Sequence, residues 1–578
     1  MVKPFAATSI RLNEVDLLSG TIDPSAAGLA APIGSKYWRG PEVSGDFTKT
    51  GAADTAWTPV PTGIYFNVKD GAYGATGDGV TDDRGAIQKA IDDASVIGGT
   101  VYFPPGTYLC GKSGENPYSF LLDNVDKVRF LGGGWGASVL KQSGNAGAGA
   151  YDLFRMTGGS DTTEFELITF DQSGLSNVGV DQCHLINVVE ASIVKIINCR
   201  FTGGIANAGA YVHAGGTAGL TCELIWVTGC DMRDAGGPIV WFDGGVSKAW
   251  ILDNDMVNTA TDPETILVAD TVGGDITDIK IKGNHIENSQ QWAIRLTSPG
   301  LIERISITNN LCLGWVSGAA LTKSQFQNNE VYISAAGHPD PAALFDTCTY
   351  LQFHKNIIGR ASTADAGLVA KFDTCTRSQA QRNLWVQGTT GATSGLIHAL
   401  DCSTMQFGSN LTRCTDAGAT VADAYLVEAV AVVADNLQFT NEQISADAGT
   451  WDQAIHVKSH GANIGVLQIT GGIQRDCDIG VLFDDNGGGP GVFTDFLMVA
   501  GVAIDADTAA FSVTVAGVYI RIGANASTFG ANLIAGTGTP AGNVTARVGS
   551  QYLRLDGGAN TTLYIKESGA DTAGWVAK

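Results

Sequence analysis

The chain has 578 residues, of which 44% are hydrophobic and only 16% are charged. This composition provides apolar surface for a large core and excludes a disordered chain. The net charge of −23 argues against nucleic acid or an anionic membrane as partner, because the summed field repels both, and an acidic polysaccharide would need a local basic groove.

The N-terminal residues contain no apolar segment of signal-peptide length, and no apolar run is long enough to span a membrane. We therefore expect synthesis in the cytoplasm without a signal peptide, and no membrane span. Eleven cysteines occur without CxxC or His/Cys zinc spacing. We interpret them as buried thiols, and we predict no metal site and no cofactor.

Residues 1–60 are the first predicted domain, an N-terminal attachment or β-hairpin region. Segments 32–57 and 547–575 share the order Gly-Ser-x-Tyr-x-Arg, then Gly-Ala, Asp-Thr-Ala and a tryptophan. We interpret this similarity as one small β-hairpin module present at both termini. The alternative is chance similarity between glycine-rich turns, because short motif matches are weak.

The second predicted domain, residues 61–109, contains an amphipathic helix and the first strands. The apolar face of the helix consists of Ile87, Ala90, Ile91, Ala94 and Ile97. Asp82 and Asp83 favour the positive end of the helix, and the pair Gly98-Gly99 ends it. Such a helix can cover the first coil of a stacked solenoid, and residues 100–108 then predict a strand, a tight turn and a second strand.

Four segments of this domain carry a family resemblance: 66–70 (FNVKD), 77–83 (GDGVTDD), 86–91 (AIQKAI) and 99–108 (GTVYFPPGTY). They resemble the entry motif of pectate-lyase-superfamily β-helices, which is widespread in phage tailspikes and capsule depolymerases. Gly71-Ala72 and Arg84-Gly85 depart from that motif in a loop and a cap. The resemblance implies an all-β fold, a right-handed parallel β-helix solenoid with a short N-terminal capping helix.

Residues 110–505 are predicted to form the solenoid. Asparagines recur in them, mostly 26 or 27 residues apart, at positions 254, 284, 310, 329, 356, 383, 410 and 436. Asparagine tolerates left-handed backbone angles in turns, and equivalent asparagines of coils about 4.8 Å apart can hydrogen-bond as a ladder. Cys348, Cys375 and Cys402 repeat the same spacing, so we predict two columns of stacked side chains, the second of core thiols.

Residues 506–578 are predicted to form a separate β-rich C-terminal domain for trimerisation or capping, because an exposed solenoid end is an unpaired sheet edge. Strands are expected at 512–515 and 518–522. Residues 556–569 look like the C-terminal segment of many phage β-helix proteins. This resemblance implies a virion protein, a homotrimer, and contacts with other phage tail or virion proteins.

Candidate site residues concentrate between positions 226 and 315. Glycoside hydrolysis needs one protonated and one ionised carboxyl group, and tryptophan rings stack on sugar C–H faces. The carboxylates proposed for catalysis are Asp231, Asp234, Asp253, Asp255 and Glu287. The side chains proposed for substrate binding are Trp241, Trp250, Trp292, Trp315, Arg233, Arg295 and His285, of which His285, Arg233 and Arg295 could also serve a lyase. For each aspartate a turn or solvated role is the alternative, and for each tryptophan core packing.

The leading hypothesis is a tailspike-like receptor-binding protein that recognises, and depolymerises as a hydrolase or a lyase, a bacterial surface polysaccharide such as capsule or lipopolysaccharide. The alternative is a non-enzymatic adhesin or structural virion appendage with the same fold. A secreted pectinase-like enzyme ranks third. The paired aspartates, Gly-His-Gly and Arg-Ile-Lys of polygalacturonases are not recognisable in the sequence, so the resemblance assigns no catalytic residue.

Overall fold

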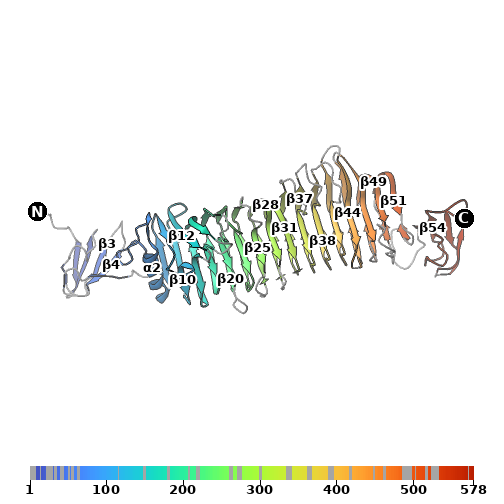
Figure 1. The fold of residues 1–578 in the computed structure, drawn as a ribbon. Helices are drawn as coiled ribbons and strands as arrows, with labels where there is room; N and C mark the ends of the chain where they lie inside the picture. The colour runs from blue at the N-terminus through green and yellow to red at the C-terminus, as the bar shows by residue number, and fades with distance from the viewer. Residues whose placement is uncertain are drawn as a thin grey trace. The chain divides into compact units, whose positions relative to one another are not determined.

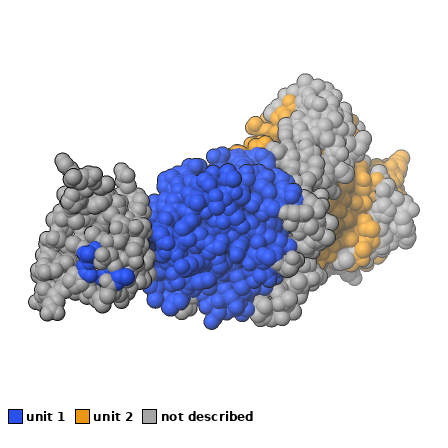
Figure 2. All heavy atoms as spheres, turned by 60° about the vertical axis from the view of Figure 1, so that its left-hand side comes forward, with its two compact units in different colours: residues 1–262, 272–274 blue, residues 263–271, 275–578 orange. Residues whose placement is uncertain are grey.

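The structure is a computed structural model that divides into two compact units, residues 1–262 with 272–274 and residues 263–271 with 275–578, coloured separately in Figure 2. The residues that it describes are 8–12, 15–20, 30–31, 36–39, 45–49, 53, 57–60, 65–114, 116–125, 127–147, 151–178, 183–205, 209–215, 222–258, 264–269, 276–297, 302–333, 341–360, 368–387, 396–415, 419–431, 433–446, 449–459, 464–484, 497–500, 503–513, 519–522, 533–569 and 572–578.

Unit 1 contains a parallel β-helix whose coils each contribute to three sheets (Figure 1). Sheet 1 contains β10 (Tyr118–Asp123), β13 (Asp152–Thr157), β16 (Ile186–Val188), β19 (Val212–Ala214) and β22 (Val240–Asp243). Sheet 2 contains β6 (Tyr65–Asn67), β8 (Gly99–Phe103), β11 (Val128–Gly132), β14 (Ser160–Glu166), β17 (Ala191–Ile197), β20 (Leu224–Thr228) and β23 (Ala249–Leu252). Sheet 3 contains β7 (Asp78–Asp82), β9 (Gly106–Cys110), β12 (Ser138–Gly147), β15 (Thr169–Val178), β18 (Arg200–Thr202), β21 (Asp231–Arg233) and β24 (Asp255–Asn258).

Unit 2 contains a parallel β-helix with the same three sheets. Sheet 1 contains β25 (Glu264–Ala269), β35 (Ala343–Asp346), β38 (Ala370–Asp373), β41 (Ile397–Leu400), β44 (Ala419–Ala429) and β47 (Gly449–Ser459). Sheet 2 contains β27 (Ile279–Lys282), β30 (Ser306–Thr308), β33 (Gln325–Gln327), β36 (Gln352–His354), β39 (Gln379–Gln381), β42 (Gln406–Gly408), β45 (Leu437–Thr440), β48 (Leu467–Thr470), β50 (Leu497–Ala500) and β52 (Tyr519–Ile522). Sheet 3 contains β34 (Glu330–Ile333), β37 (Ile357–Arg360), β40 (Leu384–Gln387), β43 (Leu411–Cys414) and β46 (Gln443–Ala446).

Some strands of unit 2 run from sheet 3 into sheet 1 without a break, and a few strands lie outside the three sheets. The continuous strands are β28 (His285–Thr297), β31 (Leu311–Ala319), β49 (Ile473–Asp484) and β51 (Ala503–Val513). A minor sheet contains β26 (Ile276–Thr277), β29 (Ile302–Glu303) and β32 (Leu321–Thr322). The predicted fold class, an all-β right-handed parallel β-helix, is confirmed.

The helix α2 (Arg84–Ile97) buries the predicted face except for its last member. Ile87 and Ala90 are buried, but Ile97 is 65% exposed because it is the last helical residue before Gly98, whose φ is +66°. Asp83 does not cap the helix. Its carboxylate instead accepts hydrogen bonds from Thr76 N at 2.7 Å and Gly77 N at 3.0 Å, which ties the helix start to the preceding loop.

Stacked aromatic rings fill the core between coils. In unit 1, Phe130 stacks on Phe165 with centroids 4.7 Å apart, and both side chains are fully buried. In unit 2, Phe326 stacks on Phe353 at 4.9 Å. Each pair occupies equivalent positions of neighbouring strands in sheet 2, so the register that stacks one coil also stacks its core.

The predicted asparagine ladder is present in unit 2. Asn356 N and Nδ2 donate to Asn383 Oδ1 at 2.9 and 3.0 Å, and Asn383 donates in the same way to Asn410. Asn284, Asn310 and Asn329 precede them in the same ladder. Buried amides are thereby satisfied coil by coil.

Two details of this prediction are wrong. Asn436 is not in the ladder, because Asn410 donates instead to Glu442 Oε1 at 3.1 Å. The left-handed residue of each corner is not the ladder asparagine but the residue before it, such as Lys355 with φ +56° and Arg382 with φ +57°. The ladder asparagines are needed for their buried hydrogen bonds rather than for an unusual backbone angle.

The predicted thiol column is also present. The thiols of Cys348, Cys375 and Cys402 are fully buried, and each donates to the carbonyl oxygen of a phenylalanine or glycine 30 residues earlier. All eleven cysteines are buried free thiols. These thiols pack as core side chains, as the spacing predicted.

The two terminal modules have one topology. In the N-terminal sheet, of β1 (Thr8–Leu12), β2 (Val15–Gly20), β3 (Lys36–Arg39), β4 (Gly45–Lys49) and β5 (Trp57–Val60), the last three strands are antiparallel in chain order. After β53 (Leu533–Gly536), the same order recurs in β54 (Gln551–Arg554), β55 (Leu563–Lys566) and β56 (Trp575–Ala577). Lys49 and Lys566 are both buried, and their ammonium groups donate to the carbonyl oxygens of Ala53 and Ala573. The sequence similarity therefore reflects a shared structure.

The boundary predicted between residues 505 and 506 falls inside a strand. β51 begins at Ala503 and pairs in parallel with β49, and β52 pairs in parallel with β50. The first antiparallel pairing that follows joins β52 to β53. The predicted strand at 518–522 matches β52, whereas Thr514 and Val515 of the other predicted strand lie outside the described residues.

Candidate functional site

Sheet 1 of unit 1 has a column of four polar and aromatic side chains, of which only Trp241 was predicted from the sequence. The register places Arg155 beside Asn187, Asn187 beside His213, and His213 beside Trp241, on consecutive strands β13, β16, β19 and β22. Alternate residues of a strand share a face, and parallel strands in register align such residues into a straight row. We call these four residues the His213 column.

Asn187 fixes the orientation of the imidazole. Its Nδ2 donates to Asp152 Oδ2 at 2.8 Å, so its Oδ1 faces His213 Nδ1 at 2.9 Å. An amide oxygen can only accept, and Nδ1 of His213 therefore carries the proton. The unprotonated nitrogen is then Nε2, which is the arrangement that a histidine general base requires.

Burial sets the charge states of this cluster. Asp152 is fully buried, and burial raises its pKa to about 7 against the opposing effect of the Asn187 hydrogen bond. Burial lowers the pKa of His213 to about 4 and lowers that of His184 well below its usual value. At neutral pH both imidazoles are therefore neutral, while Asp152 is near its midpoint.

Aromatic contacts hold the imidazoles in place. His184 stacks on His213 with centroids 4.4 Å apart, and Trp241 meets the His213 ring edge-on at 4.8 Å. Among the described residues, Trp241 Nε1 and His184 Nδ1 are buried without a hydrogen-bond partner. Buried polar atoms without partners are costly, so each of these two needs an explanation, such as a bound water or ligand.

Arg155 is the nearby cation. Its Nη1 lies 3.7 Å from Asp152 Oδ2, and 28% of its side chain is exposed. The cluster thus combines a neutral imidazole, a buried carboxyl group that titrates near neutrality and a guanidinium group. This set can remove a proton from a sugar acid while the cation neutralises the carboxylate, or can serve acid–base hydrolysis.

Three of the predicted site residues lie together on a different sheet. Asp231 and Asp255 are in register on β21 and β24 of sheet 3, and Arg233 bridges them, with its Nε 2.5 Å from Asp231 Oδ1. Arg200 adds a second cation, 3.2 Å from Asp231 Oδ2. The result is a row of alternating charges in which both Asp231 and Asp255 have an arginine partner.

The other predicted residues of unit 1 are dispersed. Asp234 and Asp253 are exposed turn residues with φ of +52° and +54°. Trp250 lies on sheet 2, edge-on to Trp226 at 5.1 Å, whereas Trp241 lies on sheet 1 in the His213 column. Trp241 is therefore the one predicted side chain that the structure places in this column.

The remaining predicted residues belong to unit 2. His285 and Glu287 begin β28 on sheet 3, and Arg295 further along the same strand forms an ion pair of 2.5 Å with the buried Glu264. Trp292 is 9% exposed and Trp315 is 1% exposed. These two indoles pack into the chain, so core packing accounts for their positions.

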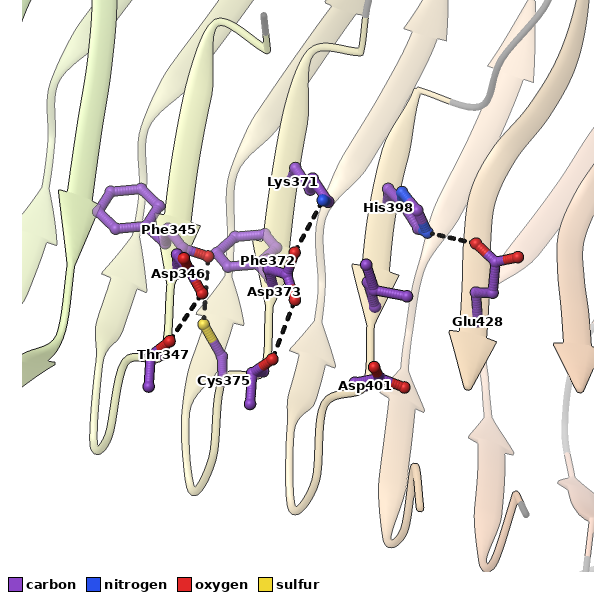
Figure 3. A network of polar contacts seen from close by, with 12 residues as sticks. Phe345, Asp346, Thr347, Lys371, Phe372, Asp373, Cys375, His398, Asp401 and Glu428 are labelled. Carbon is purple, nitrogen blue, oxygen red and sulfur yellow. Dashed lines mark hydrogen bonds and ion pairs between the residues drawn. The ribbon is translucent and has the colours of Figure 1, made fainter. Parts of the chain in front are cut away.

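Sheet 1 of unit 2 carries polar groups of its own (Figure 3). Lys371 and His398 are in register, with Lys371 Nζ 2.8 Å from Asp373 Oδ2 and His398 Nε2 3.1 Å from Glu428 Oε2. Each of these four polar groups pairs with another, whereas Trp241 Nε1 of the His213 column and Nδ1 of the adjacent His184 are buried without a hydrogen-bond partner among the described residues. We therefore place the candidate site in unit 1.

The His213 column could have been found from the sequence only by its period. Arg155, Asn187, His213 and Trp241 are 32, 26 and 28 residues apart, close to one coil. Four different residue types at this spacing form no recognisable repeat.

No helix in the described part of the chain is long and apolar enough to cross a membrane. The described residues also contain no cluster of three or more His, Cys, Asp or Glu side chains suited to a metal ion.

A family model of pectate-lyase-like proteins matches the N-terminal part of the β-helix. Residues 65–212 match the family model of rhamnogalacturonase A/epimerase, pectate lyase-like proteins. This range includes the capping helix and two of the four residues of the His213 column, Arg155 and Asn187. The predicted resemblance to pectate-lyase-like β-helices is thereby confirmed for this part of the chain.

Relatives match over short stretches. Mannuronan C5-epimerase AlgE6 of Azotobacter vinelandii is 40% identical over 116 residues, which is 20% of this chain and 13% of the relative. The pre-neck appendage protein of Bacillus phage PZA is 26% identical over 183 residues, 30% of this chain and 21% of the relative. The chain thus spans less than a quarter of the length of either relative.

Among solved structures, the tailspike protein of E. coli bacteriophage HK620 in complex with a pentasaccharide is 11% identical, with a TM-score of 0.44 over 89% of this chain and 90% of that chain.

Proposed function

We propose that this chain is a virion-associated protein that binds and chemically modifies a bacterial surface polysaccharide at the His213 column. The observation that carries the proposal is the hydrogen-bonded series Asp152–Asn187–His213, in register with Arg155 and Trp241. A row of side chains along stacked coils suits a long polymer. The pectate-lyase-like match and the phage appendage relative support the polysaccharide and the virion respectively.

His213 is the proposed general base, and Arg155 the group that neutralises a sugar carboxylate. Asp152 is fully buried, so it acts through Asn187 as a positioning residue. Trp241 offers an aromatic ring for stacking on a sugar. The sequence-predicted carboxylates Asp231 and Asp255 remain an alternative centre for hydrolysis, with Arg233 between them.

The test is incubation of the purified chain with host capsule or lipopolysaccharide. New reducing ends would indicate a hydrolase, ultraviolet-absorbing unsaturated uronates a lyase, and altered anomeric proton signals at constant chain length an epimerase. Binding without any product would favour the alternative, a non-enzymatic adhesin or appendage. Size measurement in solution tests the proposed homotrimer.

Single variants locate the centre. We expect His213→Asn to lower product formation by about 100-fold or more, the usual size of a lost acid–base group. Asp231→Asn, Asp234→Asn, Asp253→Asn, Asp255→Asn and Glu287→Gln are the comparison set. If one of these abolishes activity while the His213 variant retains it, the proposed centre is wrong.

A further inference from the structure

Sheet 2 of unit 2 presents a column of glutamines along its outer face. Six consecutive strands of sheet 2, from β33 to β48, each place one glutamine in this column. The register pairs each of these glutamines with the next: Gln325, Gln352, Gln379, Gln406, Gln438 and Gln468. Parallel strands lie about 4.8 Å apart, so these amides repeat at that interval. We call this surface, with the turns that border it, the glutamine face.

The amides in the middle of the column are open to a ligand. Gln352, Gln379 and Gln406 reach the surface, and within the described part of the chain their side chains have no hydrogen-bond partner. Each amide offers both donors and an acceptor, which suits the hydroxyl groups of a sugar. A polymer lying along the column would meet the same group at every coil.

Basic side chains border the column on both sides. Lys323 and Arg377 lie in the turns before the strands, and Lys355 and Arg382 in the turns after them, and all four are exposed. Among the described residues, neither Lys355 nor Arg382 has a carboxylate partner. Lys323 lies 3.5 Å from Glu303, and Arg377 donates to the Tyr350 hydroxyl at 2.8 Å.

The strands and adjoining turns that carry the middle of the glutamine column contain no acidic residue, in an otherwise acidic chain. The segments 320–329, 347–356, 374–383 and 402–410 contain no aspartate or glutamate, although the whole chain has 58 acidic and 35 basic residues. The charged side chains of these segments, Lys323, Lys355, Arg377 and Arg382, are therefore all basic, in contrast to the net charge of −23 of the whole chain. Burial, together with the positive charges of Arg382 and Lys355, lowers the pKa of the His354 imidazole.

A hollow lies at one end of the glutamine face. It is lined by Lys323, Ser324, Gln325, Tyr350 and Gln352. Tyr350 is 44% exposed and its ring lies 5.5 Å from the Arg377 guanidinium carbon. A cation, two amides and an aromatic ring around one hollow are the groups that recognise an acidic sugar.

We propose that the glutamine face binds an acidic polysaccharide lengthwise, at a site distinct from the His213 column. Carboxylate or sulfate groups of the glycan pair with Lys323, Lys355, Arg377 and Arg382, while its hydroxyl groups bond the glutamine amides. The proposal rests on the proposed function for its class of ligand, a polysaccharide, and adds that the polymer is anionic. Charge complementarity selects this occupant over a second copy of a chain that is itself acidic.

The test is binding of size-defined polygalacturonate fragments to the full chain, measured by calorimetry, with neutral dextran as the comparison polymer. The variant is Lys355→Gln with Arg382→Gln. The matched control is Arg413→Gln with Lys458→Gln, which removes the same charge from sheets 3 and 1 of the same unit. We expect the first pair to weaken binding about tenfold, because each exposed charge contributes modestly, and the control pair to leave it unchanged.

Salt and oligomeric state complete the test. Affinity for polygalacturonate should fall steeply as NaCl rises, because salt screens exposed charges. Equal loss in both variant pairs, salt-independent binding, or equal binding of dextran would overturn the proposal. So would a change in oligomeric state without a change in glycan affinity, since that result assigns the face to contacts between copies. The two proposals are distinguished by the His213→Asn variant. If it loses product formation but still binds polygalacturonate, then binding at the glutamine face does not depend on the His213 column.

Discussion

The Asn187 amide links Asp152 to His213: Nδ2 donates to the buried carboxyl group at 2.8 Å, and Oδ1 accepts from the imidazole at 2.9 Å. One side chain therefore couples a group that titrates near neutrality to a neutral histidine. Three residues from three consecutive strands are needed for this relationship, so it depends on the register of the β-helix.

Replacement of Asn187 by leucine should lower turnover while leaving substrate affinity nearly unchanged. The variant removes the acceptor that keeps the proton on His213 Nδ1, so the imidazole loses its preferred tautomer. We expect a fall in kcat of about 100-fold with a small change in KM. The conservative variant Asn187→Gln, which keeps an amide, serves as the control, and equal effects on kcat and KM would contradict a positioning role.

Substitution of Asp152 by asparagine should change the dependence of stability on pH. The pKa of Asp152 is raised by burial to about 7 in the folded chain, from an ordinary value of 3.8 for an aspartate in water. Between these values the folded state holds a proton that the unfolded state has lost, so stability falls as pH rises towards 7. Wild type should lose up to about 4 kcal/mol of unfolding free energy over this range relative to Asp152→Asn.

The comparison between wild type and this variant isolates that single group. Urea unfolding of both proteins at about pH 4, 5.5 and 7 provides the measurement. A constant difference between wild type and variant across the range would show that the folded pKa of Asp152 is not raised.

Glu442 ends the asparagine ladder and should behave in a similar way. Burial raises its pKa to about 8, although the Tyr425 hydroxyl and Asn410 donate to its carboxyl group. The stability contributed by the protonated form is present at low pH and is lost as pH rises towards 8. Glu442→Gln should therefore match wild type near pH 4 and exceed it by up to about 5 kcal/mol near pH 9.

A leucine at position 442 distinguishes the effect of the carboxylate charge from the effect of the lost hydrogen bonds. Glu442→Leu removes the group that accepts hydrogen bonds from Asn410 and Tyr425. It should lower the free energy of unfolding by about 2–3 kcal/mol at low pH, where Glu442→Gln is as stable as wild type. Equal stability of the glutamine and leucine variants would show that the end of the ladder needs no polar group.

The fold could be predicted because its repeats are visible in the sequence. Asn356, Asn383 and Asn410 are identical residues at the coil spacing, and each satisfies the same buried backbone and amide groups. Cys348 and Cys375 add a second column with the same period. A physical requirement that recurs in every coil leaves a repeated residue, which sequence inspection can detect.

The site could not be predicted in the same way, because residues close in sequence lie on different sheets. Trp241 and Trp250 are nine residues apart, yet one lies on sheet 1 and the other on sheet 2. Asp231 is closer to Trp241 in sequence than His213 is, but it lies on sheet 3. A coil turns between three sheets within about 27 residues, so clustering in sequence does not indicate a shared surface.

The contribution of the asparagine ladder to stability can be tested by comparing two asparagines that look equivalent in sequence, one inside the ladder and one outside it. Asn383 is 2% exposed, accepts from Asn356, and donates to both Asn410 and the Phe353 carbonyl oxygen. Asn383→Ala leaves these buried groups unsatisfied, so we expect a loss of about 3 kcal/mol of unfolding free energy.

Asn436 is the matched control, because it follows a similar motif but lies outside the ladder with a φ of +52°. Asn436→Gly keeps a residue that tolerates this angle and should cost only a few tenths of a kcal/mol. Urea unfolding of both variants decides the matter. If they lose equal stability, the ladder contributes no more than any turn asparagine, and the repeated residue would need a different physical explanation.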